Sequence, residues 1–354
     1  MYNQGNGIRL RSSARTSTGQ VRENNEDNVH LLARDLFVLA IVADGMGGAA
    51  AGEEASRIAV DTINSGILAS DYHDYQKFQS MDEGVITEMV RDSIRTANLN
   101  IVQRAINYPA LKGMGTTLTM AIIRETSVVI AHVGDSRAYL IDAEERDITQ
   151  VTADHSFVEA LVAAGHITRE EAEDHPMRNV LYRALGQADD LDIDVYYKRL
   201  NVGDRLVLCS DGLTRHVKPD EIRDIVLEEE DPAVSSQKLI DLANLRGGED
   251  NITVVVITVE RDPTKTSQTE VNITNENDDD TLLLNDRSFR RSLAEPALHE
   301  EDTAQGPPVK DEASLNVRTT VKHQVVEIPV PEKLATSEVK GTEGEGRDPR
   351  VPEE

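Results

Sequence analysis

The chain has 354 residues, of which 37 are Lys or Arg and 64 are Asp or Glu, so its formal net charge is −27 at pH 7. This excess of negative charge repels the phosphates of nucleic acids and anionic lipids, and it excludes proteins that bind either one by net charge. The single cysteine, Cys209, excludes an internal disulfide framework and is typical of a reducing compartment.

No targeting or membrane segment is predicted. Residues 1–10 lack the charged and then apolar pattern of a signal peptide. The longest apolar runs, such as residues 36–43, are about eight residues long, far short of the ~20 needed to span a bilayer. These features predict a cytoplasmic protein.

The first predicted elements are a strand and two helices. Residues 36–42 form a continuous apolar run, typical of a buried strand, and residues 52–68 and 83–106 carry helical spacing. In the second helix we expect one side to be lined by Val85, Met89, Ile94, Leu99, Val102 and Ile106.

Most of the later elements are β runs. Strands are predicted at residues 116–123, 127–133, 137–141, 205–209 and 252–259, and helices at 158–164 and 220–245. Early helices, interleaved β runs and a final strand predict an α+β fold with helices packed outside two sheets. Residues 8–262 are therefore expected to form one domain.

The remaining residues, 263–354, are predicted to be a disordered acidic tail. They contain 11 basic and 20 acidic side chains, a net charge of −9, which leaves −18 to the rest of the chain. With one aromatic residue, Phe289, they cannot bury enough apolar surface to offset chain entropy. The apolar cluster Leu282-Leu283-Leu284 is open to two interpretations, an isolated apolar spot or a short docking motif.

Acidic residues stand at the ends of four apolar runs, each beside Gly or Asn. The motifs are Asp44-Gly45-Met46-Gly47-Gly48, Gly134-Asp135-Ser136-Arg137, Ser210-Asp211-Gly212 and Glu249-Asp250-Asn251. Any one of them is an ordinary turn, but strand ends in packed sheets converge, and converging carboxylates repel unless cations lie between them. Mg²⁺ and Mn²⁺ suit such an all-oxygen shell, and Gly allows a backbone carbonyl to approach the ion.

An Arg and an acidic pair precede the first predicted strand, in the segment Arg22-Glu23-Asn24-Asn25-Glu26-Asp27. A guanidinium can make paired hydrogen bonds to two phosphate oxygens. An Arg beside a carboxylate site for two metal ions indicates a phosphoester substrate, because two ions can activate water and neutralise phosphoryl charge.

Taken in order, these motifs resemble the type 2C (PPM) family of metal-dependent protein serine/threonine phosphatases, in its bacterial form. The resemblance spans about residues 8–260 and also includes Gly115-Thr116-Thr117 and Asp154-His155-Ser156. It implies an αββα four-layer sandwich, with a flap at residues 154–185 beside the active site. It also implies two Mn²⁺ or Mg²⁺ ions and, in bacterial members, a third.

The metal ligands implied by the resemblance are Glu26, Asp27, Asp44, Gly45, Asp135, Asp211 and Asp250. Among them Asp44 would bridge two ions, and Asp135 with Asp211 matches the site of the third. Arg22 matches the phosphate-binding Arg of the family. The catalytic residues implied are Arg22, Asp27 and Asp44.

The function implied is hydrolysis of phosphoserine and phosphothreonine in proteins, by direct attack of a hydroxide that bridges two metal ions. The partners implied are phosphorylated substrates of a Ser/Thr kinase, with no nucleic acid, no membrane and a monomeric enzyme. The alternative is a catalytically weak phosphoprotein-binding module on the same fold, which the complete set of matched carboxylates disfavours.

Two positions depart from the family. Met46 stands where eukaryotic members have His, and Ala49 stands where many bacterial members have His. We therefore expect water to protonate the leaving group, with His155 as the less favoured substitute.

A rival chemistry is indicated by Cys209 and Arg215, which form a Cys-x₅-Arg pattern that resembles Cys-dependent phosphatases. Asp211 would oppose both a thiolate and a phosphate there, which disfavours this alternative.

Overall fold

The structure, a computed structural model, describes residues 7–34, 36–68 and 75–263. The predicted acidic tail, with its cluster Leu282-Leu283-Leu284, lies outside the described residues except for Pro263. Two antiparallel sheets organise the described part of the chain. No helix in these ranges is both long enough and apolar enough to cross a bilayer.

The first sheet has the strand order β1-β11-β10-β7-β8. Its strands are β1 (Ile8–Ser17), β11 (Ile252–Arg261), β10 (Arg205–Cys209), β7 (Arg137–Asp142) and β8 (Asp147–Gln150). β11 lies between β1 and β10 and is buried over its first eight residues, because the sheet is covered on both faces.

The second sheet has the order β2-β3-β5-β6-β9, with β4 paired to the end of β3. Its strands are β2 (Asp27–Arg34), β3 (Phe37–Met46), β4 (Gly115–Thr116), β5 (Leu118–Arg124), β6 (Ser127–Val133) and β9 (Asp194–Arg199). In the pairing of β2 with β3, Asp27 lies opposite Asp44. Strand geometry therefore brings two of the predicted site residues together.

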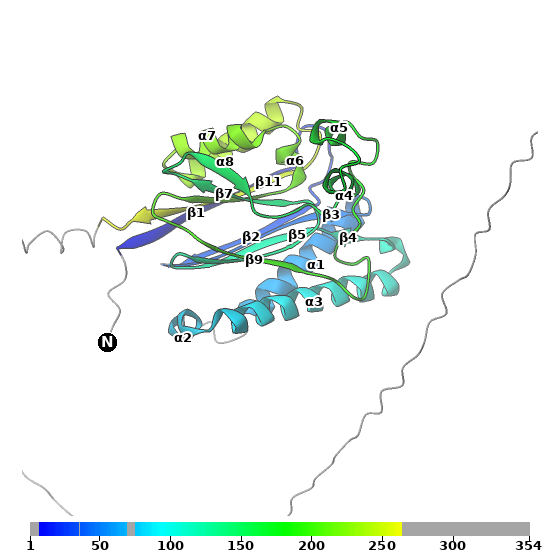
Figure 1. The fold of residues 1–354 in the computed structure, drawn as a ribbon. Coiled ribbons are helices and arrows are strands. Elements are labelled where there is room, and N and C mark those ends of the chain that lie inside the picture. The colour runs from blue at the N-terminus through cyan, green and yellow to red at the C-terminus, as the bar shows by residue number, and fades with distance from the viewer. Residues whose placement is uncertain (1–6, 35, 69–74, 264–354) are drawn as a thin grey trace, which may run out of the picture. The chain divides into compact units, whose positions relative to one another are not determined.

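Helices cover the outer face of each sheet (Figure 1). On the second sheet lie α1 (Ala49–Leu68), α2 (Tyr75–Ser80) and α3 (Glu83–Asn107), followed by a 3₁₀ turn at Pro109–Leu111. On the first lie α6 (Asp211–Thr214), α7 (Pro219–Glu228) and α8 (Pro232–Leu245). The flap contains α4 (Phe157–Ala163) and α5 (Arg169–Glu173).

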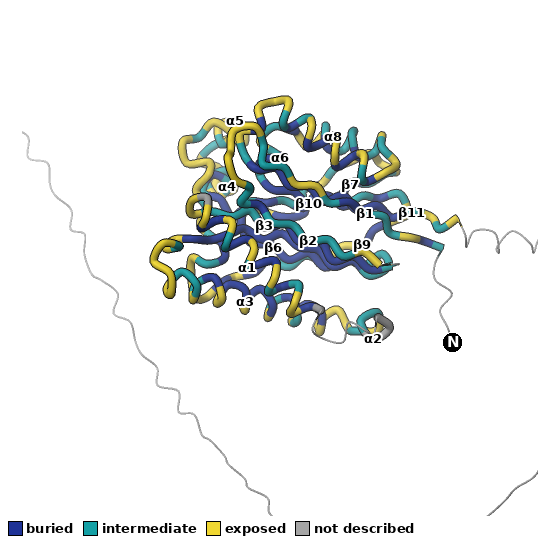
Figure 2. The backbone as a smooth tube through the Cα atoms, turned by 180° about the vertical axis from the view of Figure 1, so that it is seen from behind, coloured by how far each residue is buried: buried dark blue, intermediate teal, exposed yellow. Residues whose placement is uncertain are grey.

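Three apolar clusters join these layers. One lies between α1, α3 and the second sheet, one between the two sheets, and one between the first sheet and α6, α7 and α8. Figure 2 shows the buried residues concentrated in the sheets and the exposed residues on the outer helices and the flap. The predicted αββα sandwich is confirmed.

The apolar face predicted for the second helix is wrong in part. Val85, Leu99 and Ile106 are 55%, 54% and 69% exposed, whereas Ile86 and Ile94 are fully buried. The buried face follows the 3.6-residue period through Ile86, Val90, Ile94, Ala97 and Ile101. It includes a small residue, Ala97, because α3 packs closely against α1.

Two further differences concern element boundaries. The helix predicted at residues 220–245 is two helices, because the chain breaks after Glu228 and restarts at Pro232, where Asp231 caps the new helix. The sequence patterns also did not predict the strands β1, β2, β8 and β9. All four carry polar residues on partly exposed faces, so none of them forms a continuous apolar run.

The corrected face of α3 can be tested by truncating one residue on each side. Ile94→Ala should lower the free energy of unfolding by about 2–5 kcal/mol, because it opens a cavity between α3 and the second sheet. Leu99→Ala, on the exposed side, should cost less than about 0.5 kcal/mol. Urea denaturation of both variants measures the difference, and equal losses would contradict the assignment.

Candidate active site

A cavity of about 430 Å³ lies where the ends of the strands from both sheets meet. β3 ends at it, and the turns after β6, after β10 and before β11 each contribute one Asp. Of the predicted site residues, the cavity is lined by Arg22, Glu26, Asp44, Gly45, Asp135, Asp211 and Asp250. The remaining predicted site residue, Asp27, does not line the cavity and is buried behind the residues that do.

Asn251 holds the N-terminal loop at the cavity. Its side-chain amide donates to the carbonyl oxygens of Thr18 and Asn24, both at 2.9 Å, and its Oδ1 accepts from the Glu26 backbone N–H at 2.8 Å. These three hydrogen bonds position Arg22 and Glu26 beside Asp250. The sequence placed Asn251 in a motif but gave it no role.

Two threonines hold Asp44 in place through its backbone. The Asp44 N–H donates to Thr117 Oγ1 at 3.0 Å, and Thr116 Oγ1 donates to the Asp44 carbonyl at 2.8 Å. Thr117 Oγ1 also lies 2.7 Å from the hydroxyl of Ser136, which follows Asp135. The ends of β3 and β6 are therefore linked, and the Asp44 carboxyl is left to face the cavity.

Asp27 is buried directly beneath this wall. Its Oδ2 accepts from Ser210 Oγ at 2.8 Å, while its Oδ1 is buried without a hydrogen-bond partner among the described residues. Oδ1 of Asp211 is likewise buried without a hydrogen-bond partner among the described residues. Buried carboxylate oxygens without partners are rare and costly, so each is a candidate cation ligand.

The glycines near Glu26 serve a close approach of two backbones. A Cβ on Gly45 would lie 2.2 Å from the Gly52 carbonyl oxygen, and a Cβ on Gly52 would lie 1.9 Å from Glu26 Oε2. α1 can therefore pack against the end of β3 only because both residues lack a side chain. The contact also places the Glu26 carboxyl at the first turn of α1.

Burial and mutual repulsion make the carboxyl groups of Asp44, Asp27 and Asp135 reluctant to ionise. Burial, reinforced by Asp27 and Asp211, raises the pKa of Asp44 well above its ordinary value. Burial raises the pKa of Asp27 to about 7, and burial with the nearby Asp211 raises that of Asp135 to about 8. The same causes shift ligands of divalent cations when no cation neutralises them.

Two arginines reach these carboxylates. Arg22 Nη2 lies 3.0 Å from Asp250 Oδ1, and Arg215 Nη1 lies 3.1 Å from Asp250 Oδ2. Arg215 also pairs with Asp211, one helical turn before it. The Arg22 side chain is 47% exposed, so one part of its guanidinium remains open to a ligand.

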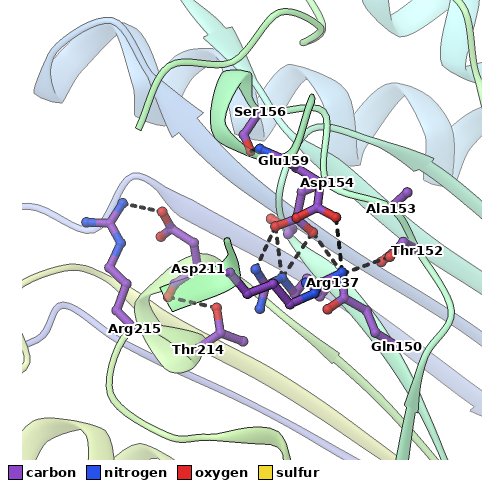
Figure 3. Close-up of polar contacts among 12 residues, drawn as sticks. Arg137, Gln150, Thr152, Ala153, Asp154, Ser156, Glu159, Asp211, Thr214 and Arg215 are labelled. Carbon is purple, nitrogen blue, oxygen red and sulfur yellow. Dashed lines mark hydrogen bonds and ion pairs between the residues drawn. The ribbon is translucent and has the colours of Figure 1, made fainter. Parts of the chain in front are cut away.

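The flap side of the site contains a separate, internally satisfied ion pair. Arg137 binds Asp154 through two nitrogens, the shortest contact being 2.7 Å (Figure 3). His155 Nδ1 accepts from the Gly134 N–H at 3.0 Å, so its Nε2–H points to Asp194 at 3.2 Å. His155 is 2% exposed and does not line the cavity, which favours its structural role.

Met46 lines the cavity and accepts a weak hydrogen bond from Gln187 at its Sδ, at 3.5 Å. Asn179, Leu181 and Gln187 also line the cavity, and none of them was predicted individually. No sequence motif marks these three residues, because they lie in the irregular segment at the end of the flap and not at the end of a strand. No His is among the residues that line this cavity in the described part of the chain.

Comparison with known proteins agrees with this arrangement. The family described as Protein phosphatase 2C matches residues 16–241. The serine/threonine phosphatase stp of Listeria monocytogenes is 39% identical over 257 residues, which cover 72% of this chain and 98% of that protein. The chain belongs to the protein phosphatase 2C family.

Solved structures of phosphatases share the fold. Stp1 from Staphylococcus aureus is 38% identical with a TM-score of 0.65, over 71% of this chain and 95% of that one. The catalytic domain of the serine threonine protein phosphatase PstP, in complex with two manganese ions, is 37% identical with a TM-score of 0.61, over 72% of this chain and 99% of that one.

The residues present fit the divalent ions that the protein phosphatase 2C family implies. The donor set is all oxygen, and two of its buried atoms lack partners. No three acidic, His or Cys side chains within the described ranges are already gathered around one point. Arg215 instead holds Asp211 and Asp250, which are two of the candidate ligands.

The structure disfavours the alternative based on Cys209. The thiol is fully buried at the end of β10, and burial raises its pKa to about 12. A nucleophilic Cys needs a lowered pKa and access to substrate. Arg215, which completed the Cys-x₅-Arg pattern, binds carboxylates instead.

The carboxyl cluster makes the metal-free protein sensitive to pH. Asp135 has a pKa of about 8 in the fold and an ordinary value of 3.8, so between these values the folded state binds more protons than the unfolded chain. Its contribution to stability is present at low pH and is lost as pH rises through about 8. In chelator-treated protein, Asp135→Asn should therefore raise the melting temperature more at pH 8 than at pH 5.5.

Thermal unfolding at the two pH values measures this effect. Asp190→Asn, in the exposed segment before β9, is the matched control and should shift the melting temperature little at either pH. An equal gain from Asp135→Asn at both pH values would contradict the prediction.

Proposed function

We propose that the protein is a metal-dependent phosphatase that hydrolyses phosphoserine and phosphothreonine in proteins. The observation that carries the proposal is the convergence of five carboxylates and Arg22 on one cavity, in a chain of the protein phosphatase 2C family. The Listeria monocytogenes relative is named a serine/threonine phosphatase, and the PstP structure contains manganese. Both support this activity with Mn²⁺ or Mg²⁺.

The residues proposed to hold two ions are Asp44, the Gly45 carbonyl, Asp211, Asp250, Glu26 and Asp27, with Asp135 beside them. Bound ions would supply Lewis-acid activation of water and neutralise charge on the phosphoryl group. Water attacks phosphorus directly, and the protein itself forms no covalent bond to the phosphoryl group.

Arg22 is proposed to bind the substrate phosphate. Its guanidinium is anchored on Asp250 and is 47% exposed, so it can present further N–H donors to two phosphate oxygens. Because no His lines the cavity in the described part of the chain, water protonates the leaving serine or threonine alkoxide. Met46 and Gln187 line the cavity and offer no acid.

The finer organisation is also part of the proposal. Residues 8–262 act as the catalytic domain, and residues 263–354 as a disordered acidic tail. The enzyme acts as a cytoplasmic monomer on substrates of a Ser/Thr kinase and requires neither membrane nor nucleic acid. The net charge of −27 supports the last point, because it repels anionic lipid and nucleic acid.

Hydrolysis of a phosphothreonine peptide in Mn²⁺ tests the activity. Asp211→Asn and Asp44→Asn should each lower kcat/KM at least ~10²-fold, because each removes a charged candidate ligand without changing side-chain size. Phosphate release measures the rate, and Asp190→Asn is the matched control.

Chelation with EDTA should abolish the wild-type rate, and added Mn²⁺ should restore it. A wild-type protein that is inert in Mn²⁺ but binds the phosphopeptide would favour the phosphoprotein-binding module. An Asp211→Asn variant with wild-type activity would remove Asp211 from the site.

Direct attack by water has its own test. In H₂¹⁸O the released phosphate should carry one solvent oxygen, and acid quenching during turnover of a ³²P-labelled peptide should leave no label on the protein. Mass spectrometry and autoradiography measure the two results. Label retained on the protein would indicate a covalent intermediate and would contradict the proposed chemistry.

A further inference from the structure

Arg215 lies inside the site although the sequence predicts no catalytic role for it. Asp211 is the first residue of α6, and Arg215 follows that helix at position i+4, so its guanidinium returns to the Asp211 carboxylate (Figure 3). Its other terminal nitrogen reaches Asp250 at 3.1 Å. The side chain is 28% exposed and lines the cavity.

Asp135 lines the same cavity as Arg215. Its carboxylate has no hydrogen bond or ion pair with any other part of the chain that the structure describes. The other nearby cation, Arg137, is already bound to Asp154 through two nitrogens. Burial raises the pKa of Asp135, and Arg215 is the strongest positive charge acting against that rise.

The charges around the cavity favour two divalent ions. The cavity is lined by five carboxyl groups, and Asp27 behind the wall is the sixth. Arg22 and Arg215 supply two positive charges. Four negative charges remain when all six carboxyls are ionised, which equals the charge of two divalent cations. In this balance the positive charge of Arg215 is needed, together with two divalent ions and Arg22, to neutralise the six carboxylates.

We propose that Arg215 is a built-in cation of the active site, which takes the place of a third metal ion beside Asp135 and Asp211 and limits the site to two. The resemblance to bacterial phosphatases leads one to expect that third ion. A divalent ion between these two carboxylates would meet the like charge of the guanidinium that already binds Asp211. This inference rests on the proposed metal-dependent function.

The number of Mn²⁺ ions bound per chain tests the proposal directly. Full-length protein is stripped with chelator and titrated with Mn²⁺ at moderate ionic strength, and free Mn²⁺ is followed by electron paramagnetic resonance. Wild type should bind two ions. Arg215→Gln, which keeps the length but loses the charge, should bind three, and Arg215→Lys should bind two.

A second substitution locates the added ion. Arg215→Gln combined with Asp135→Asn should return the stoichiometry to two, because it removes a ligand of the new site. Arg246→Gln is the matched control. Arg246 pairs with Glu221 and does not line the cavity, so this variant should bind two ions like wild type.

Wild type that binds three ions, or Arg215→Gln that folds by circular dichroism and binds only two, overturns the proposal. The wild-type measurement decides even if a variant fails to fold. The outcome is distinct from that of the proposed function. A wild type that hydrolyses the phosphopeptide and binds three ions overturns only the role of Arg215, and one that binds two ions without hydrolysis overturns only the activity.

Discussion

Repulsion between the carboxylates that two packed sheets bring to one cavity governs the arrangement of the surrounding residues. Asp44, Asp135, Asp211 and Asp250 come from four different strand ends, and the apolar core between the sheets fixes where those ends lie. Because that core is close-packed, the strands cannot separate to relieve the repulsion. Relief must come from protons, from arginine or from cations, and the raised pKa values of Asp44 and Asp135 show that uptake of protons is one of these responses.

The polar residues around the site are arranged to restrain backbone and leave carboxylates free. Thr116 and Thr117 bind the backbone of Asp44, and Asn251 binds the loop that carries Glu26. None of these bonds uses a carboxylate oxygen of Asp44 or Glu26. A site that used its carboxylates for internal hydrogen bonds would be more stable without metal and would bind metal less well.

The sequence could predict the parts of the site that depend on local pattern. An apolar run that ends in Asp-Gly marks a strand end, so Asp44 and Asp211 were identifiable from neighbours alone. The role of Arg215 was not, because it depends on a four-residue helix that returns the guanidinium to Asp211. The buried face of α3 was also misjudged: Leu99 is apolar, but the packing against α1 selects the row that contains Ala97.

Asp250 connects the two kinds of ligand proposed for the site, a divalent cation and a phosphate. Arg22 bonds to both of its oxygens, at 3.0 and 3.1 Å, and Arg215 bonds to one of them. A carboxylate whose charge is shared with a cation attracts a guanidinium less strongly. In the proposed site, a cation held by Asp250 would therefore weaken the hold of Asp250 on Arg22, and Arg22 would then be better able to bind a phosphate. By linkage, phosphate held by Arg22 would also favour the cation, so the two affinities would rise together. The Arg22 side chain is more exposed than that of Arg215. This difference is consistent with the proposal that Arg22 binds the substrate phosphate while Arg215 stays paired with the carboxylates.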